Sequence, residues 1–155
     1  MKIIVAIVSF ILFFTLQTPV VLADWKEDQA EADQYYESGE YSKAFKTYFK
    51  LAKMGVSYSQ DRVSKMYENG QGKKVNMEEA YAWSVLAAQR GATEKMTRRD
   101  SLLEQNSDKA KAEKKAEKLL SKYGREALQA RADSKARLKH NTKSGGCTGS
   151  KLGCR

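Results

Sequence analysis

The chain has few of the residues that build metal centres or cysteine-rich folds. Its 155 residues include one His (His140) and two Cys (Cys147 and Cys154). Metal centres in proteins use three or four ligands at characteristic spacings. The inventory therefore excludes most of them, and it disfavours a zinc site, for which two thiolates and one distant imidazole supply too few ligands. A catalytic Cys–His pair would have to use His140, and a scaffold held by many disulfides is excluded.

Proline and strand-like patterns are also scarce. The one Pro is Pro19, so no proline interrupts a helix after residue 23. Residues 24–140 show no clear two-residue alternation of Val, Ile and Thr, and their apolar residues recur at helical spacing. The sequence therefore predicts an all-α fold.

Residues 1–23 have the three-part pattern of a secretory signal peptide. Lys2 supplies a positive charge, an uncharged and mostly apolar run covers residues 3–16, and small residues precede Asp24. We expect cleavage between Ala23 and Asp24 and a periplasmic or secreted product. The alternative is an uncleaved anchor, although the 14-residue apolar run is shorter than the roughly 20 residues that span a bilayer.

The two cysteines lie in residues 141–155, a segment that holds four of the ten glycines and is expected to be a flexible tail. In an oxidising compartment, Cys147 and Cys154 can form a disulfide around the six residues between them. Such a short loop stabilises by about 2–3 kcal/mol in the loop-closure model. The bond would restrain the end of the tail and would not hold a core together. Whether the two cysteines are linked to each other stays open.

Residues 24–91 repeat a pattern of small and aromatic side chains. Four residues recur 36 positions later with the same or a similar side chain: Ala44, Phe45, Ala52 and Gly55 correspond to Ala80, Tyr81, Ala88 and Gly91. A period of this length is typical of helix-turn-helix repeat proteins. The sequence therefore predicts two such units. The packing residues of the first unit are expected to be Ala44, Tyr48, Ala52 and Gly55.

The second unit carries the clearer signals. Its first helix has an apolar stripe at i, i+3, i+4 and i+7, formed by Val63, Met66, Tyr67 and Gly70. A turn with Gly70 and Gly72 follows, and Asn76 with Glu79 three residues later indicates a helix start with a capping box. The second helix is expected to end at Gly91. Its inward residues are expected to be Ala80, Trp83, Ala87 and Ala88.

This second unit resembles a Sel-one-like repeat, a relative of the tetratricopeptide repeat. The matching positions are Tyr67, Gly70, Gly72, Ala80, Trp83, Ala87, Ala88 and Gly91. The sequence departs from the family pattern at Ser64, Lys73, Asn76 and Ser84. The first unit is closer to a plain tetratricopeptide unit, and the resemblance covers about residues 30–91. It implies a right-handed α-solenoid that binds other proteins, usually outside the bacterial cytoplasm.

Two repeat units are too few to bury their own apolar faces, because such solenoids normally need about three units and a polar cap at each end. Residues 92–140 are therefore expected to form a basic helical capping region. The predicted fold is a short α-solenoid of two helix-turn-helix repeats in residues 24–91, with C-terminal capping helices.

The capping region divides at residues 106–108, which have the chemistry of a helix N-cap. The helix before this break would pack Met96, Leu102 and Leu103 against the repeats, and the helix after it carries alanines and leucines at helical spacing. A degenerate third repeat would cover the same end. Residues 125–140 carry only a thin apolar stripe, which indicates a solvated helix.

The sequence shows no catalytic constellation and predicts a protein that is not an enzyme and uses no cofactor or metal. General acid–base catalysis needs a titratable pair held in a pocket, whereas His140 lies in a basic stretch near the C-terminus. Some cysteine-rich relatives are described as acting on β-lactams, but the cysteine pairs of that branch are missing here. Tyrosines left outside the core are the candidate partner-binding residues, because tyrosine offers wide contact at low entropic cost. They are Tyr36, Tyr41 and Tyr58.

Charge is divided between the two halves of the chain. Residues 24–94 contain 10 basic and 12 acidic side chains, a net of −2, whereas residues 95–155 contain 17 and 7, a net of +10. The basic half is a solvated helix surface or a patch that attracts an anionic envelope surface, either lipid or acidic polymer. Nucleic acid is the weakest interpretation, because no aromatic residue follows Tyr123. The sequence thus predicts an adaptor for a protein partner, with a cationic binder of the cell envelope as the alternative, and gives no oligomeric state.

Overall fold

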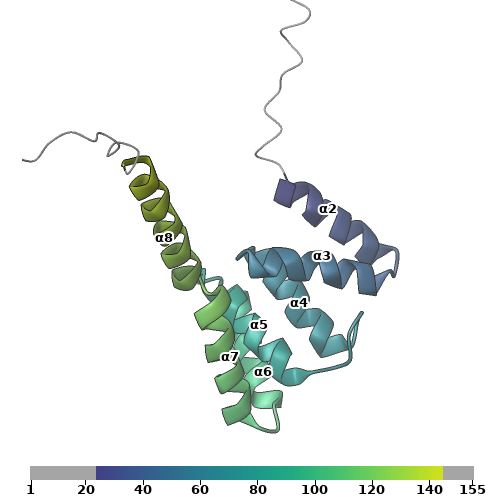
Figure 1. The fold of residues 1–155 in the computed structure, drawn as a ribbon. Coiled ribbons are helices and arrows are strands. Elements are labelled where there is room, and N and C mark those ends of the chain that lie inside the picture. Colours follow the sequence, from purple (N-terminus) through teal and green to yellow (C-terminus); the bar gives the residue numbers. More distant parts are fainter. Residues whose placement is uncertain (1–23, 145–155) are drawn as a thin grey trace, which may run out of the picture.

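The structure is a computed structural model that describes the backbone of residues 24–144 and the side chains of residues 25–140. Within these residues the chain is helical apart from its turns. The helices are α2 (Asp24–Glu37), α3 (Tyr41–Lys53), α4 (Ser57–Asn69), α5 (Met77–Ala88), α6 (Thr93–Gln105), α7 (Lys109–Tyr123) and α8 (Arg125–Ser144) (Figure 1). The predicted all-α fold is confirmed. The predicted signal peptide, Cys147 and Cys154 lie outside the described residues.

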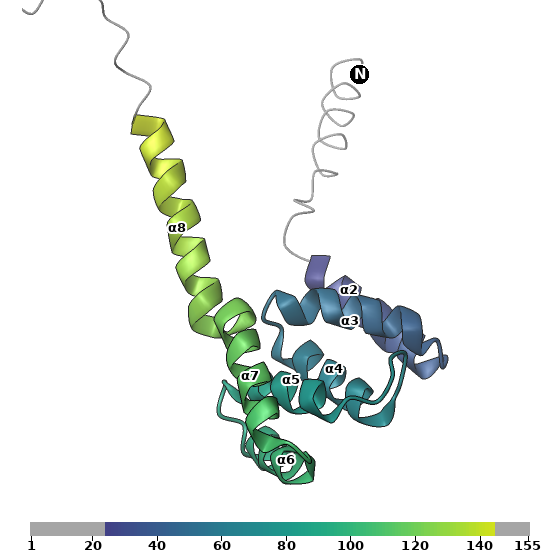
Figure 2. The same ribbon diagram turned by 60° about the horizontal axis from the view of Figure 1, so that its bottom comes forward.

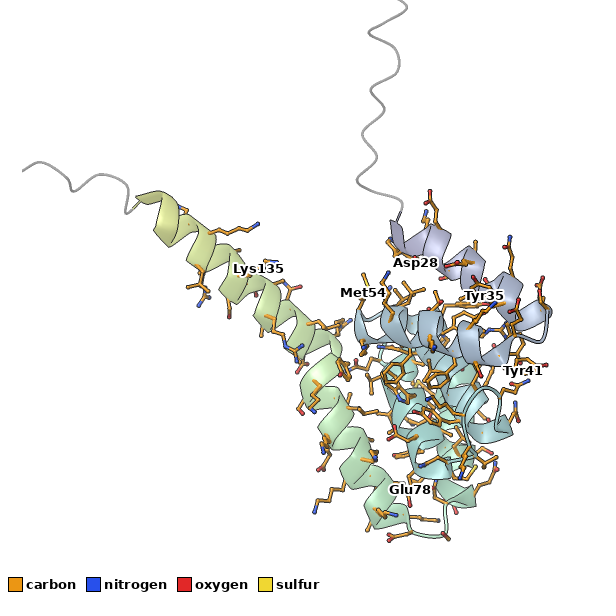
Figure 3. The ribbon with its side chains drawn as sticks, turned by 45° about the vertical axis from the view of Figure 1, so that its right-hand side comes forward. Asp28, Tyr35, Tyr41, Met54, Glu78 and Lys135 are labelled. Atoms are coloured by element: carbon orange, nitrogen blue, oxygen red, sulfur yellow. The ribbon has the colours of Figure 1, made fainter. Side chains whose placement is uncertain are left out.

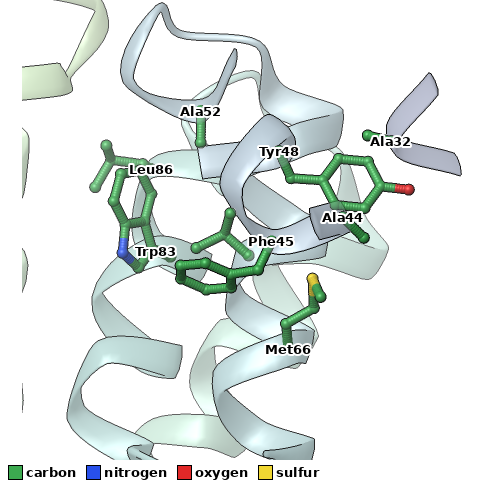
Figure 4. Close-up of a cluster of buried hydrophobic side chains, with 9 residues drawn as sticks. Ala32, Ala44, Phe45, Tyr48, Ala52, Met66, Trp83 and Leu86 are labelled. Atoms are coloured by element: carbon green, nitrogen blue, oxygen red, sulfur yellow. The ribbon is translucent and has the colours of Figure 1, made fainter. Parts of the chain in front are cut away.

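Two helical hairpins follow one another along the chain. Helix α2 packs against α3, α4 packs against α5, and contact between α3 and α4 joins the two hairpins. Apolar side chains from all four helices form one buried cluster, which we call the hairpin core (Figure 4). Its members are Ala32, Ala44, Phe45, Tyr48, Ala52, Val63, Met66, Trp83 and Leu86. This arrangement is the predicted short α-solenoid of two helix-turn-helix repeats.

The turn inside the second hairpin is set by the residues at its two ends. Gly70 ends α4 with a φ of 71°. This left-handed backbone conformation is rarely adopted by residues other than glycine. Asn76 caps α5 as predicted, since its side chain accepts a hydrogen bond of 2.9 Å from the Glu79 N–H. The second bond of the predicted capping box, from the Asn76 N–H to the Glu79 carboxylate, is not formed. The Asn76 N–H donates instead to the Tyr67 carbonyl oxygen. The Glu79 carboxylate instead binds Lys115 of α7, which attracts it as a cation.

Helix α5 lies at the centre of the molecule. Eight of its 12 residues are buried, because α4, α6 and α7 all pack against it. One side of α5 contributes to the hairpin core. Another side packs against α6 and α7 in a second apolar cluster, formed by Ala80, Tyr81, Ala82, Leu102, Ala112 and Ala116. Helices α6 and α7 each pack against α5 and contact each other only slightly. They therefore cap the solenoid as two separate covers and do not form the hairpin of a third repeat.

Met96 does not lie where the sequence places it on α6. Leu102 is buried and Leu103 packs partly buried beside it, whereas Met96 is 40% exposed. Six residues separate Met96 from Leu102, which puts the two side chains roughly 120° apart around the helix axis. The prediction that Met96, Leu102 and Leu103 share one apolar side of α6 is therefore wrong. Only the C-terminal half of α6, with Leu102 and Leu103, contributes to the buried cluster.

Helix α8 projects away from the body of the molecule, as Figures 1 and 2 show. Its first turns pack against α7, and Leu128 lies directly against Gly55 in the turn between α3 and α4. From Gln129 to His140 every side chain is exposed. The helix runs to Ser144, past the boundary expected at His140, because no glycine interrupts it before residue 145. Among the described residues, no helix has both the length and the apolarity to cross a bilayer.

Candidate functional site

The residues predicted to pack the repeats form the frame on which the site is built. Seven of them are buried: Ala44, Tyr48, Ala52, Ala80, Trp83, Ala87 and Ala88. Tyr67 is partly buried against the hairpin core, and the glycines Gly55, Gly70, Gly72 and Gly91 have positive φ. The small alanines allow close approach of the helices, while Trp83 fills the space between them. This packing fixes the relative positions of the tyrosines that lie outside the core.

Three tyrosines predicted to bind a partner lie in one row with the buried Tyr48. Tyr36 of α2 lies between Tyr41 and Tyr48, with ring centroids 5.2 and 6.5 Å away. The row continues from Tyr48 to Tyr58 of α4, with 6.3 Å between centroids. All three pairs meet edge to face, a favourable geometry for aromatic rings. The fold thus brings together residues from three helices that the sequence could only name separately.

Arg62 of α4 holds the row together. The carbon at the centre of its guanidinium lies 4.1 Å from the ring centroid of Tyr36, 5.5 Å from that of Tyr48 and 5.7 Å from that of Tyr58. Its Nε also donates a hydrogen bond of 3.3 Å to the Tyr48 hydroxyl. A cation within about 6 Å of an aromatic centroid is attracted to the ring, so one guanidinium restrains three rings.

Asp33 of α2 balances the charge of Arg62. Its Oδ1 accepts hydrogen bonds from the hydroxyls of Tyr48 and Tyr58, the latter at 2.8 Å, and lies 3.9 Å from the Arg62 Nη2. The Tyr36 hydroxyl donates to the Gln71 Oε1 at 2.9 Å. These hydroxyls are thus occupied within the molecule. What the row offers to a partner is ring surface, at Tyr41 (36% exposed) and Tyr58 (40% exposed).

Burial makes two of these phenols, those of Tyr48 and Tyr58, weaker acids. It raises the pKa of Tyr48 well above the usual value of 10, and the hydrogen bond to Asp33 raises this pKa further. The same two causes, in the same order, raise the pKa of Tyr58. A neutral phenol that donates to a carboxylate is a structural and binding group, and neither hydroxyl is set up as a base or nucleophile.

A second set of polar contacts ties α4 to α6 beside the row. Arg98 of α6 pairs with Glu68 and lies 3.6 Å from Asp61, both on α4. Its Nη1 also donates a hydrogen bond of 2.8 Å to the Ser64 hydroxyl, and Lys95 donates to Ser57 at 2.8 Å. Ion pairs therefore connect α2 to α4 and α4 to α6. These contacts restrain the helices that carry the tyrosine row.

The sequence pointed to the tyrosines but not to Asp33, Arg62 or Arg98. Each of these charged residues is an ordinary surface residue by its helical position. Their partners are about thirty residues away in the chain, so no local spacing marks the pairs. A clue lies only in the density of tyrosine around Arg62, since arginine and tyrosine pair readily.

No protein-family model, curated protein or solved structure matches this chain. Within the part of the chain that the structure describes, no three His, Cys, Asp or Glu side chains gather as metal ligands would.

Proposed function

We propose that this protein is a non-catalytic helical-repeat adaptor, related to the Sel-one-like repeat proteins, that binds a protein partner in the periplasm or outside the cell. The observation that supports this most directly is the row of tyrosines held by Arg62 and Asp33. Rings that are fixed before binding lose little conformational freedom when a partner arrives. Tyrosine and arginine also dominate the energetic centres of protein interfaces. Tyr41 and Tyr58 are the expected contact points.

Site-specific photo-crosslinking tests this proposal in cells that make the full chain. The crosslinking amino acid replaces Tyr41 or Tyr58, and a matched control replaces Ser107, which is exposed in the turn between α6 and α7. One protein adduct of the same mass is expected from positions 41 and 58, and none from position 107. Adducts of equal yield from all three positions would show that contact is not confined to the tyrosine row.

A cationic binder of the anionic cell envelope is the second candidate, and α8 is the feature that favours it. Residues 125–140 contain five basic and two acidic side chains, and those from Gln129 onward are exposed. Figure 3 shows Lys135 of α8 on the opposite side of the molecule from Tyr41. The two candidate surfaces can therefore be altered independently.

Salt and a charge variant separate the two functions. Contact through exposed charges is screened over about 8–10 Å at physiological salt, so retention by anionic vesicles should fall steeply with added salt and in a Lys135→Gln, Arg137→Gln variant. The crosslinked adduct from position 58 should persist under both changes. Loss of the adduct in the α8 variant would favour the envelope binder.

Export and the disulfide are tested on the protein itself. N-terminal sequencing of the mature chain is expected to begin at Asp24, whereas a start at Met1 would indicate a retained anchor. Cys147 and Cys154 are expected to react with an alkylating reagent only after reduction, as detected by mass spectrometry. Alkylation without reductant would rule out the link.

A further inference from the structure

A hollow on another face of the molecule lies outside the proposed tyrosine contact surface. Phe49 of α3, Trp83 of α5 and Tyr123 of α7 line it, and its cavity volume is about 230 Å³. The Phe49 and Trp83 rings meet edge to face at 5.3 Å, and Trp83 stacks on Tyr123 at 5.9 Å. This volume is below the roughly 300–1,000 Å³ of sites that hold a whole drug-sized ligand, so the hollow fits a single side chain. We call this feature the Trp83 hollow.

Lysines of α7 border the Trp83 hollow. Lys115 is paired with Glu79 of α5 at 2.7 Å. Lys118 and Lys122 also line the hollow, and among the described residues no carboxylate lies within 4.0 Å of either ammonium. They are four residues apart on one helix and so present like charges on the same side. A ligand carboxylate between them would relieve that repulsion, whereas Glu79 is already neutralised by Lys115.

Trp83, one of the lining residues, also carries a hydrogen-bond donor without a partner. Trp83 is 1% exposed, and its Nε1 is a buried nitrogen with no hydrogen-bond partner in the described residues. Buried donors without partners are rare in native proteins, because leaving one unpaired costs free energy. The Trp83 N–H lies beneath the surface, so what the hollow offers to a ligand is the partly exposed rings of Phe49 and Tyr123 together with the two lysines.

We propose that the Trp83 hollow binds an acidic peptide segment of the protein partner, with an apolar side chain against Phe49 and Tyr123 and a carboxylate between Lys118 and Lys122. The proposal rests on the protein-binding function and extends it to a second contact surface. An acyl chain is less well suited, because the hollow is open to water and bordered by charge. A nucleobase is also less well suited, because the stacked Trp83 and Tyr123 rings already cover each other.

Trp83 itself can report binding. The chain has two tryptophans, so a Trp25→Phe background leaves Trp83 as the only one. The full-length protein is titrated with an acetylated, amidated peptide of sequence Asp-Glu-Phe-Glu-Asp, and with its uncharged analogue Asn-Gln-Phe-Gln-Asn. The ionic strength is about 0.15 M, where long-range attraction is screened beyond about 8 Å. A saturable change in Trp83 emission is expected with the acidic peptide and not with the analogue.

A charge-matched pair of variants locates the site. Lys118→Gln with Lys122→Gln should weaken binding roughly tenfold, the effect of losing two exposed ionic contacts. Lys135→Gln with Arg137→Gln removes the same charge from α8 and should change binding by less than about twofold. Equal weakening in both variants, or no saturable change in wild type, would overturn the proposal. So would the same emission change produced by vesicles containing phosphatidylglycerol. Circular dichroism melts confirm that both variants fold.

The outcome is separable from that of the adaptor function. If the acidic peptide does not bind while crosslinking from positions 41 and 58 still yields one adduct, this inference fails and the proposed function stands. If both fail, the protein-binding function itself is rejected.

Discussion

Ser64 shows how much one hydroxyl can connect at the scale of a single residue. It is fully buried on α4, and its Oγ donates a hydrogen bond of 2.6 Å to the Ala80 carbonyl oxygen of α5. The same oxygen accepts a bond of 2.8 Å from the Arg98 Nη1 of α6. Ser64 stands where the resemblance to Sel-one-like repeats implies glycine. The departure therefore has a physical role, because it links three helices.

A Ser64→Ala substitution is expected to lower the free energy of unfolding by about 1–3 kcal/mol, because it leaves a buried carbonyl and a guanidinium short of a partner. Ser42→Ala is the matched control, since Ser42 is exposed on α3 and surface changes usually stay within about 0.5 kcal/mol. Urea denaturation of both variants measures the difference. Equal stabilities would mean that the Ser64 contacts contribute nothing net.

At the scale of elements, the turn between α4 and α5 is held against the start of α3. A side-chain carbon at Gly72 would lie 2.3 Å from the Tyr41 carbonyl oxygen, far inside any real contact. Gly72 also has a φ of 74°. It is therefore required twice, for its backbone conformation and for the close approach of another backbone.

Comparison of two glycines separates these requirements. Gly39 has a similar φ of 77°, but nothing lies within 4 Å of the position of an added carbon. Gly39→Ala is expected to cost about 1–2 kcal/mol for the left-handed backbone alone. Gly72→Ala should cost a further 1–3 kcal/mol or more, roughly the price of overpacking against atoms that cannot move aside. Thermal melts give the order, and a Gly39→Ala variant as unstable as Gly72→Ala would contradict the close approach.

At the scale of the whole molecule, stability depends on neutral tyrosines. Burial raises the pKa of Tyr48, Tyr58, Tyr67 and Tyr81 above the ordinary value of 10. The unfolded chain therefore releases these protons at a lower pH than the folded protein does. Their contribution to stability is complete below about pH 10 and is lost as the pH rises through the folded pKa values.

The urea midpoint is accordingly expected to be lower at about pH 11 than at about pH 8. A Tyr48→Phe variant should lose less between these two pH values than wild type, because its buried ring has no proton to release. Ultraviolet absorbance of tyrosinate in the same samples shows when the phenols ionise. If all eight tyrosines ionise near pH 10 with no change in the urea midpoint, the four tyrosines named above are not buried as described.

The sequence by itself determined the helices, their turns and the inward faces of the two hairpins. Helical spacing, the glycine that ends α4 and the Asn76 cap are set by interactions within a few residues of the chain. The same periodicity marks Ala44 and Trp83 as inward, and both are buried. It did not foresee that α5 is covered on further faces, because an apolar residue pattern does not state how many neighbours a helix will have.

Tertiary structure alone decided which side chains meet outside the core. Asp33 and Arg62 join three tyrosines from three helices, and Lys118 and Lys122 line a hollow together with Trp83. Met96 is exposed although its local pattern predicted packing against the repeats. The Glu79 carboxylate binds Lys115 instead of the Asn76 N–H. Contacts between helices depend on the angle and rotation at which whole helices pack, and residue spacing within one helix does not contain that information.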